Sequence, residues 1–191
     1  MGNPSFASVA WRRPKLRLPL EPSFAPSSRV WRSPPRCLSR ASGRMSADML
    51  YLDTSFVAPL VLNEEVSPLV ESYLAKQAAG SLAVSHWTRV EFACLVAQGV
   101  KAQHFSTQTA ASVLAEFEAL VQESFQVWLP SAADYDLART LLGHFEPGLR
   151  EGGALHLAIA KNQGADKILT LDDGLLKAAK SLKIPASRGI R

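Results

Sequence analysis

Met49-Leu-Tyr-Leu-Asp53 is the stretch that decides the fold, a short apolar run that ends in an acid. Such a run is typical of a strand buried on both faces. Three more short apolar runs follow, at residues 82–85, 125–129 and 167–171. Segments with the apolar spacing of helices separate them. Strands that alternate with helices predict an α/β domain whose parallel sheet is covered by helices on both sides.

The expected helices carry recognisable start signals. Ser67-Pro68 has serine as an N-cap and proline at the first helical position, and Ser131 with Asp134 resembles a capping box. Cys94 lies on an apolar helix side, so we expect it to be buried as a small hydrophobic residue. The expected helices span residues 54–62, 67–80, 89–101, 106–125, 131–145, 154–163 and 173–182.

Three acidic residues mark one edge of the predicted sheet. Asp53 directly follows the first strand, Glu91 lies in the first turn of the helix after the second strand, and Asp172 directly follows the fourth. Parallel strands bring these positions together at the edge where such sheets bind ligands. Clustered carboxylates repel each other unless a cation intervenes, and oxygen ligands suit Mg²⁺ or Mn²⁺. The pattern therefore predicts a metal site that activates water against phosphate.

Each acid also has a purely structural interpretation. Asp53 would cap the helix that follows it, Thr88 and Glu91 have the spacing of a capping box, and Asp172 or Asp173 would cap the last helix. Helix caps do not require that all three acids lie at one edge of a sheet, whereas a metal site does. Both interpretations stay open on the sequence.

Four blocks of the sequence, in order, resemble the PIN-domain ribonucleases and, among them, the VapC-type toxins of toxin–antitoxin pairs. The blocks are Leu50-Tyr-Leu-Asp53-Thr-Ser55, Ser85-His-Trp-Thr-Arg-Val-Glu91-Phe-Ala93, Leu149-Arg-Glu-Gly-Gly153-Ala-Leu-His156-Leu-Ala158 and Ile168-Leu-Thr-Leu-Asp172. The resemblance covers residues 49–185. It implies a PIN-like three-layer α/β/α fold with a central parallel sheet of four to five short strands.

The resemblance also implies a function. The implied function is that of an endoribonuclease that needs Mg²⁺ or Mn²⁺ and cleaves RNA phosphodiester bonds. The implied partners are a cognate antitoxin, which keeps the enzyme inactive, and a second copy of the chain in a homodimer. The implied location is the cytoplasm, with no part in a membrane. Asp53, Glu91 and Asp172 would be its catalytic metal ligands. The expected supporting residues are Thr54 and Ser55 at the acidic edge and, for weak RNA contacts, Arg89 and Arg150. His156, in an apolar helix, is expected to be structural.

One position departs from the family pattern: Gly153 stands where the family has the third aspartate. Glycine offers no ligand, so metal affinity and rate should fall. Glu151 would replace the missing acid only if it lay before the helix and turned inward. The alternative function is therefore a catalytically weakened PIN-fold protein that still binds an antitoxin or RNA. A phospho-acceptor domain of the receiver or haloacid-dehalogenase type is disfavoured, because the first strand is followed by Asp53-Thr-Ser rather than Asp-x-Asp.

The chain divides into two regions by composition. Residues 1–47 are predicted to be a disordered basic extension rich in proline, serine and arginine, and residues 48–191 to be the PIN domain. Residues 1–44 hold nine basic side chains against one acid, a net charge of +8, whereas residues 45–191 carry −4. The extension has the composition of an organelle transit peptide, but its seven prolines oppose a helix, and a start codon assigned too early is an alternative.

Overall fold

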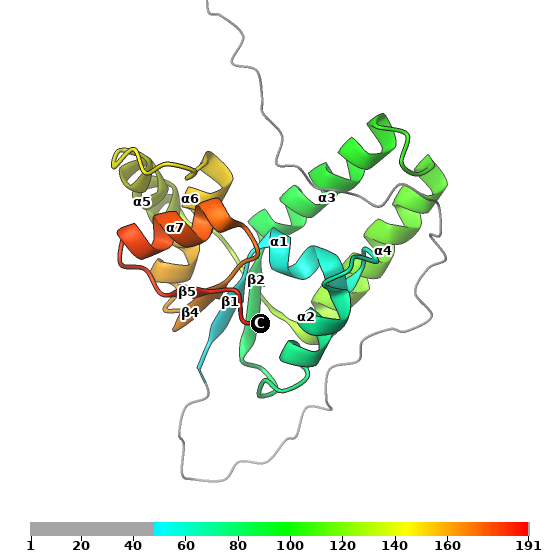
Figure 1. The fold of residues 1–191 in the computed structure, drawn as a ribbon, viewed down its shortest axis with the longest axis horizontal. Helices are drawn as coiled ribbons and strands as arrows, with labels where there is room; N and C mark the ends of the chain where they lie inside the picture. The colour runs from blue at the N-terminus through cyan, green and yellow to red at the C-terminus, as the bar shows by residue number, and fades with distance from the viewer. Residues whose placement is uncertain (1–47, 191) are drawn as a thin grey trace, which may run out of the picture.

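The computed structural model describes residues 48–190, and the predictions for residues 1–47 lie outside this range. Five parallel strands form one sheet in the order β3-β2-β1-β4-β5 (Figure 1). Their bounds are Leu50–Leu52 (β1), Leu82–Ser85 (β2), Gln126–Trp128 (β3), Lys167–Leu169 (β4) and Ala186–Ser187 (β5). The predicted parallel sheet of four to five short strands is confirmed.

Alternate residues of β1 supply two separate cores. Leu50 and Leu52 face one side of the sheet and pack with residues of the first four helices, whereas Tyr51 faces the other side and packs with the last three. Because helices cover both faces of the sheet and β1 lies between β2 and β4, all three of its residues are buried. The continuous apolar run in the sequence has this physical cause.

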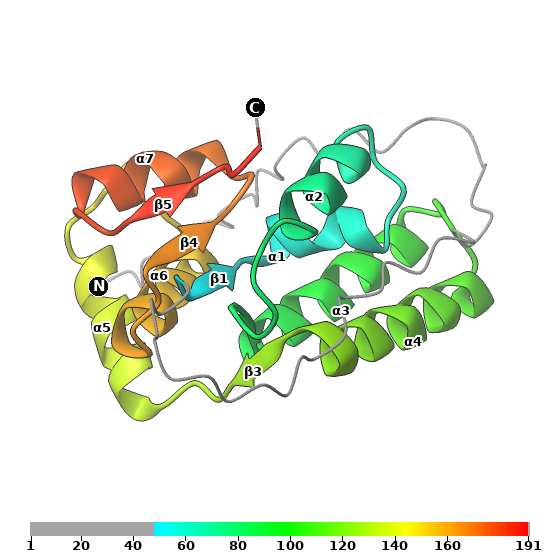
Figure 2. The ribbon, with the colours of Figure 1, turned by 90° about the horizontal axis from the view of Figure 1, so that it is seen from below.

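The helices form a layer on each side of the sheet, as Figures 1 and 2 both show. The predicted three-layer α/β/α arrangement is confirmed. No helix within residues 48–190 is long and apolar enough to cross a membrane. On one side lie α1 (Thr54–Val57), the 3-10 helix η1 (Ala58–Leu60), α2 (Ser67–Leu74), α3 (His86–Lys101) and α4 (Thr107–Ser124), and on the other α5 (Ala132–Leu142), α6 (Glu151–Asn162) and α7 (Asp173–Ser181).

Helix α3 differs from its prediction in its start and in its buried face. It begins at His86 with Ser85 as N-cap, and the capping box joins Ser85 to Thr88. The predicted box between Thr88 and Glu91 is therefore wrong. Phe92 of α3 stacks on an aromatic ring of α4 at a centroid distance of 3.8 Å. This large ring takes the core position, which leaves Cys94 exposed rather than buried.

Two other helices also begin or end differently from their predictions. Ser67 is the first residue of α2 rather than its side-chain cap, because its hydroxyl instead donates to the Pro59 carbonyl at 2.6 Å. The same helix ends at Leu74, six residues before Gly80. Helix α6 begins at Glu151 rather than at residue 154. Its two glycines are therefore helical, which matters for the site below.

Candidate acidic site at the carboxyl edge of the sheet

Asp53 leaves the end of β1 and is almost completely buried, with 4% of its surface exposed. It caps α1 by accepting the Phe56 N–H at 3.0 Å. Its other partners are two hydroxyls, those of Ser55 at 2.7 Å and Thr170 at 2.6 Å. Burial raises the pKa of the Asp53 carboxyl, although the charge of His156 and these hydrogen bonds work in the opposite direction.

Thr170 joins the first and fourth strands at this edge. Its hydroxyl donates to Asp53 and accepts the Asp172 N–H at 3.0 Å. Ser55 makes a parallel connection, because its hydroxyl bonds Asp53 and accepts the Leu171 N–H at 2.8 Å. Ser55 thus holds the position that the sequence predicted for a supporting residue. Thr170 was not predicted, and its only signal was its place just before Leu171-Asp172.

Glu91 lies in the second turn of α3 and reaches across to two other elements. Its Oε2 accepts the Thr54 hydroxyl at 2.6 Å and lies 2.6 Å from His156 Nε2. Burial by itself would raise the pKa of Glu91, but the hydrogen bond and charge of His156, together with the Thr54 hydroxyl, lower it below its ordinary value. Glu91 is therefore held as a carboxylate by protein groups.

His156 contacts Glu91 and Tyr51, a connection that the sequence did not predict. It is 2% exposed, and its Nδ1 lies 2.8 Å from the Tyr51 hydroxyl while its Nε2 meets Glu91. Tyr51 in turn lies 2.7 Å from the Ser85 hydroxyl. Burial strongly raises the pKa of Tyr51, which keeps its phenol protonated. A continuous hydrogen-bonded path therefore runs from Ser85 to Glu91, along which a proton can be held between Glu91 Oε2 and His156 Nε2.

The two glycines at the start of α6 face different neighbours. A Cβ at Gly152, four residues before His156, would overlap Glu91 Oε1. A Cβ at Gly153 would instead meet Leu175 Cδ1 of α7 at 3.1 Å. Gly152 thus provides the space that the Glu91 carboxylate occupies. Gly153, the position of the missing third acid, faces the first turn of α7.

Asp172 caps α7 and is more exposed than the other two acids. Its Oδ1 accepts the N–H groups of Gly174 at 2.6 Å and Leu175 at 3.1 Å. The interpretation of Asp172 as a helix cap is therefore confirmed. Neighbouring Asp173 forms an ion pair with Arg188 on the surface. Asp173 does not cap α7, because it is the first residue of the helix.

The remaining predicted residues lie at the surface. Arg89 forms a bidentate pair with Glu118 of α4, at 3.0 and 2.6 Å, so its guanidinium is committed to holding α3 against α4. Arg150 is the N-cap residue of α6 and is exposed. Glu151 is exposed in the first turn of α6. It does not precede the helix, so the route by which it would replace the third acid is wrong.

The donor set at this edge does not match a divalent cation. Within residues 48–190, no three side chains among histidine, cysteine, aspartate and glutamate lie close enough together to hold a metal ion. Asp53 is satisfied by hydroxyls and a backbone N–H, Asp172 by backbone N–H groups, and Glu91 by His156 and Thr54. The residues in this arrangement do not fit Mg²⁺ or Mn²⁺. The charge of Glu91 is met by an imidazole instead.

Comparison with known proteins identifies one family. The family model described as "PIN domain" matches residues 50–181, which is more than half of the chain and includes all three acids. No curated protein sequence matches the chain.

Several solved structures share the fold. The VapC20 toxin of Mycobacterium tuberculosis, described as cleaving the sarcin–ricin loop, is 16% identical with a TM-score of 0.53, and the match covers 68% of this chain and 94% of the toxin. FitAcB from Neisseria gonorrhoeae is 18% identical with a TM-score of 0.57, covering 74% and 98%. VapBC2 from Rickettsia felis, bound to a DNA fragment from its promoter, is 14% identical with a TM-score of 0.50, covering 73% and 97%.

Proposed function

Because this chain belongs to the PIN domain family, we propose that it binds RNA as the toxin-side member of a toxin–antitoxin pair and cleaves it only weakly, because its acidic edge does not fit the metal ion. The observation that carries the proposal is the state of the acidic edge. Asp53, Glu91 and Asp172 are present, but Gly153 occupies the third-acid position and His156 holds Glu91. In a metal-dependent nuclease, the loss of one direct metal ligand removes roughly several kcal/mol of transition-state stabilisation.

The partners in this proposal are inferred from the PIN domain family and from the similar solved structures. PIN domains are generally nucleases, and the four sequence blocks resemble the ribonuclease toxins of this family. The similar structures include a toxin described as cleaving the sarcin–ricin loop and a VapBC pair bound to promoter DNA. A cognate antitoxin, an RNA ligand and a homodimer are therefore the proposed partners of this chain.

A fully active Mg²⁺- or Mn²⁺-dependent endoribonuclease is the second candidate. The placement of three carboxylates favours it, because Asp53, Glu91 and Asp172 all follow strands at the same edge of the sheet. In this candidate the three acids would be sufficient as catalytic metal ligands. The hydrogen bonds that now satisfy them would have to be exchanged for metal contacts, and that exchange lowers the expected affinity.

The experiment compares metal binding and RNA cleavage in the full-length protein. Mn²⁺ is titrated calorimetrically into the unmodified chain, Gly153→Asp and Gly143→Asp, and each protein is then incubated with a mixed RNA pool. Gly143→Asp is the matched control, because it adds the same acid at the exposed end of α5. Asp53→Ala in the Gly153→Asp background shows whether any cleavage belongs to this site.

The weakened-site proposal predicts weak binding and little cleavage by the unmodified chain, with both restored by Gly153→Asp alone. Strong cleavage by the unmodified chain that disappears with Asp53→Ala would support the second candidate instead. If Gly153→Asp gains neither Mn²⁺ binding nor cleavage, the explanation through a missing third acid is wrong.

A further inference from the structure

Charge is divided unevenly along the described part of the chain. Residues 161–188 hold six basic side chains against three acids, whereas residues 48–160 hold five basic side chains against thirteen acids. The net charges are +3 and −8. A local excess of positive charge on an otherwise acidic domain attracts anionic partners to that region. The basic residues are Lys161, Lys167, Lys177, Lys180, Lys183 and Arg188.

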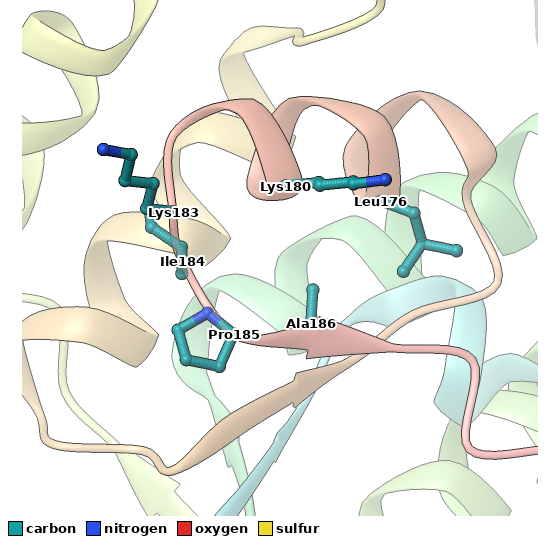
Figure 3. Close-up of a pocket in the computed structure, with 6 residues that line it drawn as sticks. All are labelled: Leu176, Lys180, Lys183, Ile184, Pro185 and Ala186. Carbon is teal, nitrogen blue, oxygen red and sulfur yellow. The ribbon is translucent and has the colours of Figure 1, made fainter.

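Three of these lysines line a groove beside the edge strand β5. A pocket between α7 and β5 is lined by Lys180 and Lys183 over an apolar floor (Figure 3). A second depression shares Lys183, Ile184 and Pro185 with the first and adds Lys161 at the end of α6. We call the two together the lysine groove, formed by Lys161, Lys180, Lys183, Ile184 and Pro185.

The lysines of the groove are not neutralised by the protein. Across residues 48–190, none of the three forms an ion pair with a carboxylate. Figure 3 shows Lys180 extending along α7 toward Leu176, whereas Lys183 points the opposite way. The two ammonium groups therefore lie toward opposite ends of the pocket. Such a spacing suits an extended polyanion better than a single phosphate.

Helix dipoles explain only part of this arrangement. Lys161 and Lys180 lie in the last turns of α6 and α7, where cations are favourable. Lys183 lies beyond the end of α7, in the left-handed region with a φ of 56°. Because it directly follows the C-cap Leu182, the dipole favours its charge as well, but the dipole does not explain why three lysines line one groove.

An exposed aromatic ring lies beside the same end of α7. Phe145, in the loop between α5 and α6, is 88% exposed and has a φ of 55°, a conformation that bulky side chains rarely adopt. The next residue, Glu146, accepts a hydrogen bond from Ser181 at 2.7 Å, and Ser181 directly follows Lys180. Figures 1 and 2 both show this loop against the end of α7. The loop that carries this exposed ring is therefore tied to the last turn of α7, the turn that also carries Lys180.

We propose that the lysine groove and Phe145 together bind single-stranded RNA, with phosphates along the lysines and a base stacked on the phenyl ring. Positive grooves flanked by aromatic side chains are the usual means of holding single strands. Lys180 lies about 12 Å along α7 from Asp172, at 1.5 Å per residue, so the surface is separate from the acidic edge. The choice of RNA as the polyanion rests on the proposed function.

The test measures RNA affinity without any cleavage. A short fluorescein-labelled oligouridylate is titrated with the full-length protein in EDTA, and anisotropy is recorded at several salt concentrations. The variants are Lys180→Glu with Lys183→Glu, Phe145→Ala, and a matched control, Lys76→Glu with Lys101→Glu. The control makes the same change of charge at two exposed lysines of the other helical layer. Circular dichroism confirms that each variant is folded.

The groove variant should weaken binding more than tenfold and reduce the slope of log affinity against log salt by about 0.7 for each phosphate that a lysine no longer neutralises. Phe145→Ala should weaken binding roughly tenfold and leave the slope unchanged, since stacking carries no charge. The control should bind like the unmodified chain. Because the salt slope depends on the number of neutralised phosphates, a general loss of stability would not reproduce this pattern.

Four results would overturn the assignment. Equal loss in the groove variant and the control would show attraction to net charge alone. Full competition by poly-glutamate of matched charge would assign the surface to an acidic polypeptide. If the Lys180→Glu, Lys183→Glu variant still binds RNA tightly, the lysine groove is not the RNA-binding surface, but the proposed function stands. If the unmodified chain binds no RNA, the RNA-directed function and this surface fail together.

Discussion

His156 Nε2 lies 2.6 Å from Glu91 Oε2, and this contact depends on the absence of a side chain at Gly152, one helical turn earlier on α6. The imidazole and the glycine together determine where the Glu91 carboxylate lies. His156 supplies a partner for its charge, and Gly152 supplies the space for it. The acidic edge is thus organised from α6 as much as from the sheet.

Adjacent glycines on α6 should respond to alanine in opposite directions. Gly152→Ala forces the Glu91 carboxylate to move and breaks its buried contacts, which should cost about 1–3 kcal/mol of unfolding free energy. Gly153→Ala meets the side-chain ends of Leu175 at 3.1 Å and Leu149 at 3.6 Å. A small shift of Leu175 relieves the closer contact, so the change should be neutral or gain up to about 1 kcal/mol from helix propensity. Urea denaturation of both variants measures the difference. Equal effects would show that Gly152 is not shaping the site.

Asp53→Asn should make the protein more stable at pH 7. Burial raises the pKa of Asp53 in the folded state, so the stability linked to its protonated form is present below the unfolded value of about 4 and is lost as the pH rises through the folded value. The amide avoids that loss. Urea unfolding at pH 7 and near pH 3.5 should show an advantage that shrinks at the lower pH. An Asp53→Asn protein that is less stable than the unmodified chain at pH 7 would contradict this account.

Tyr51→Phe should destabilise the protein at neutral pH by about 1–2 kcal/mol, because it leaves His156 Nδ1 buried without its partner. The difference from the unmodified chain should shrink above about pH 10 by about 1.4 kcal/mol per pH unit. Burial raises the pKa of Tyr51, so only the unfolded phenol ionises there, and the stability present below about pH 10 is lost as the pH rises. Tyr135→Phe, at an exposed ring, is the control, and chemical denaturation from pH 8 to 11 is the measurement.

Arg89→Ala should weaken the fold slightly and leave RNA affinity unchanged. The Arg89–Glu118 pair joins α3 to α4 with both side chains about a third exposed, a setting in which ion pairs contribute about 0.5–1 kcal/mol. Arg139→Ala removes a looser pair with Asp136, at 3.6 Å and largely exposed, and should have no measurable effect on stability. Anisotropy with the same oligouridylate checks the binding. A marked loss of affinity in Arg89→Ala would return this arginine to the RNA-binding residues.

The sequence was sufficient for the parts of the site that depend on strand ends. Asp53 and Asp172 could be placed because each directly follows a short apolar run, and parallel strands end at one edge. Glu91 was placed on the correct helix but with the wrong local role. The capping box that explained it belongs to Ser85 and Thr88, because α3 starts earlier than its apolar pattern suggests.

Other parts of the site depend on contacts between residues far apart in the chain. The links of His156 to Tyr51 and Glu91 join residues separated by 105 and 65 positions, and no spacing in the sequence reports them. A histidine among leucines and alanines therefore looked structural. Gly152 was overlooked for a related reason. Alignment with a family pattern drew attention to Gly153, whereas the packing of α6 against Glu91 shows which glycine must lack a side chain.

The strand order also governs when the acidic edge can exist during synthesis. β1 leaves the ribosome early, but its neighbour β4 and the Thr170 hydroxyl that holds Asp53 come 117 residues later. Chains emerge at about 5–20 residues per second, so Asp53 waits for several seconds before its partner is available. A nascent or prematurely released chain that stops before residue 170 carries Asp53 without the Thr170 hydroxyl that positions it. Such fragments lack the hydrogen bond from Thr170 to Asp53, so the acidic edge is assembled only in nearly finished molecules.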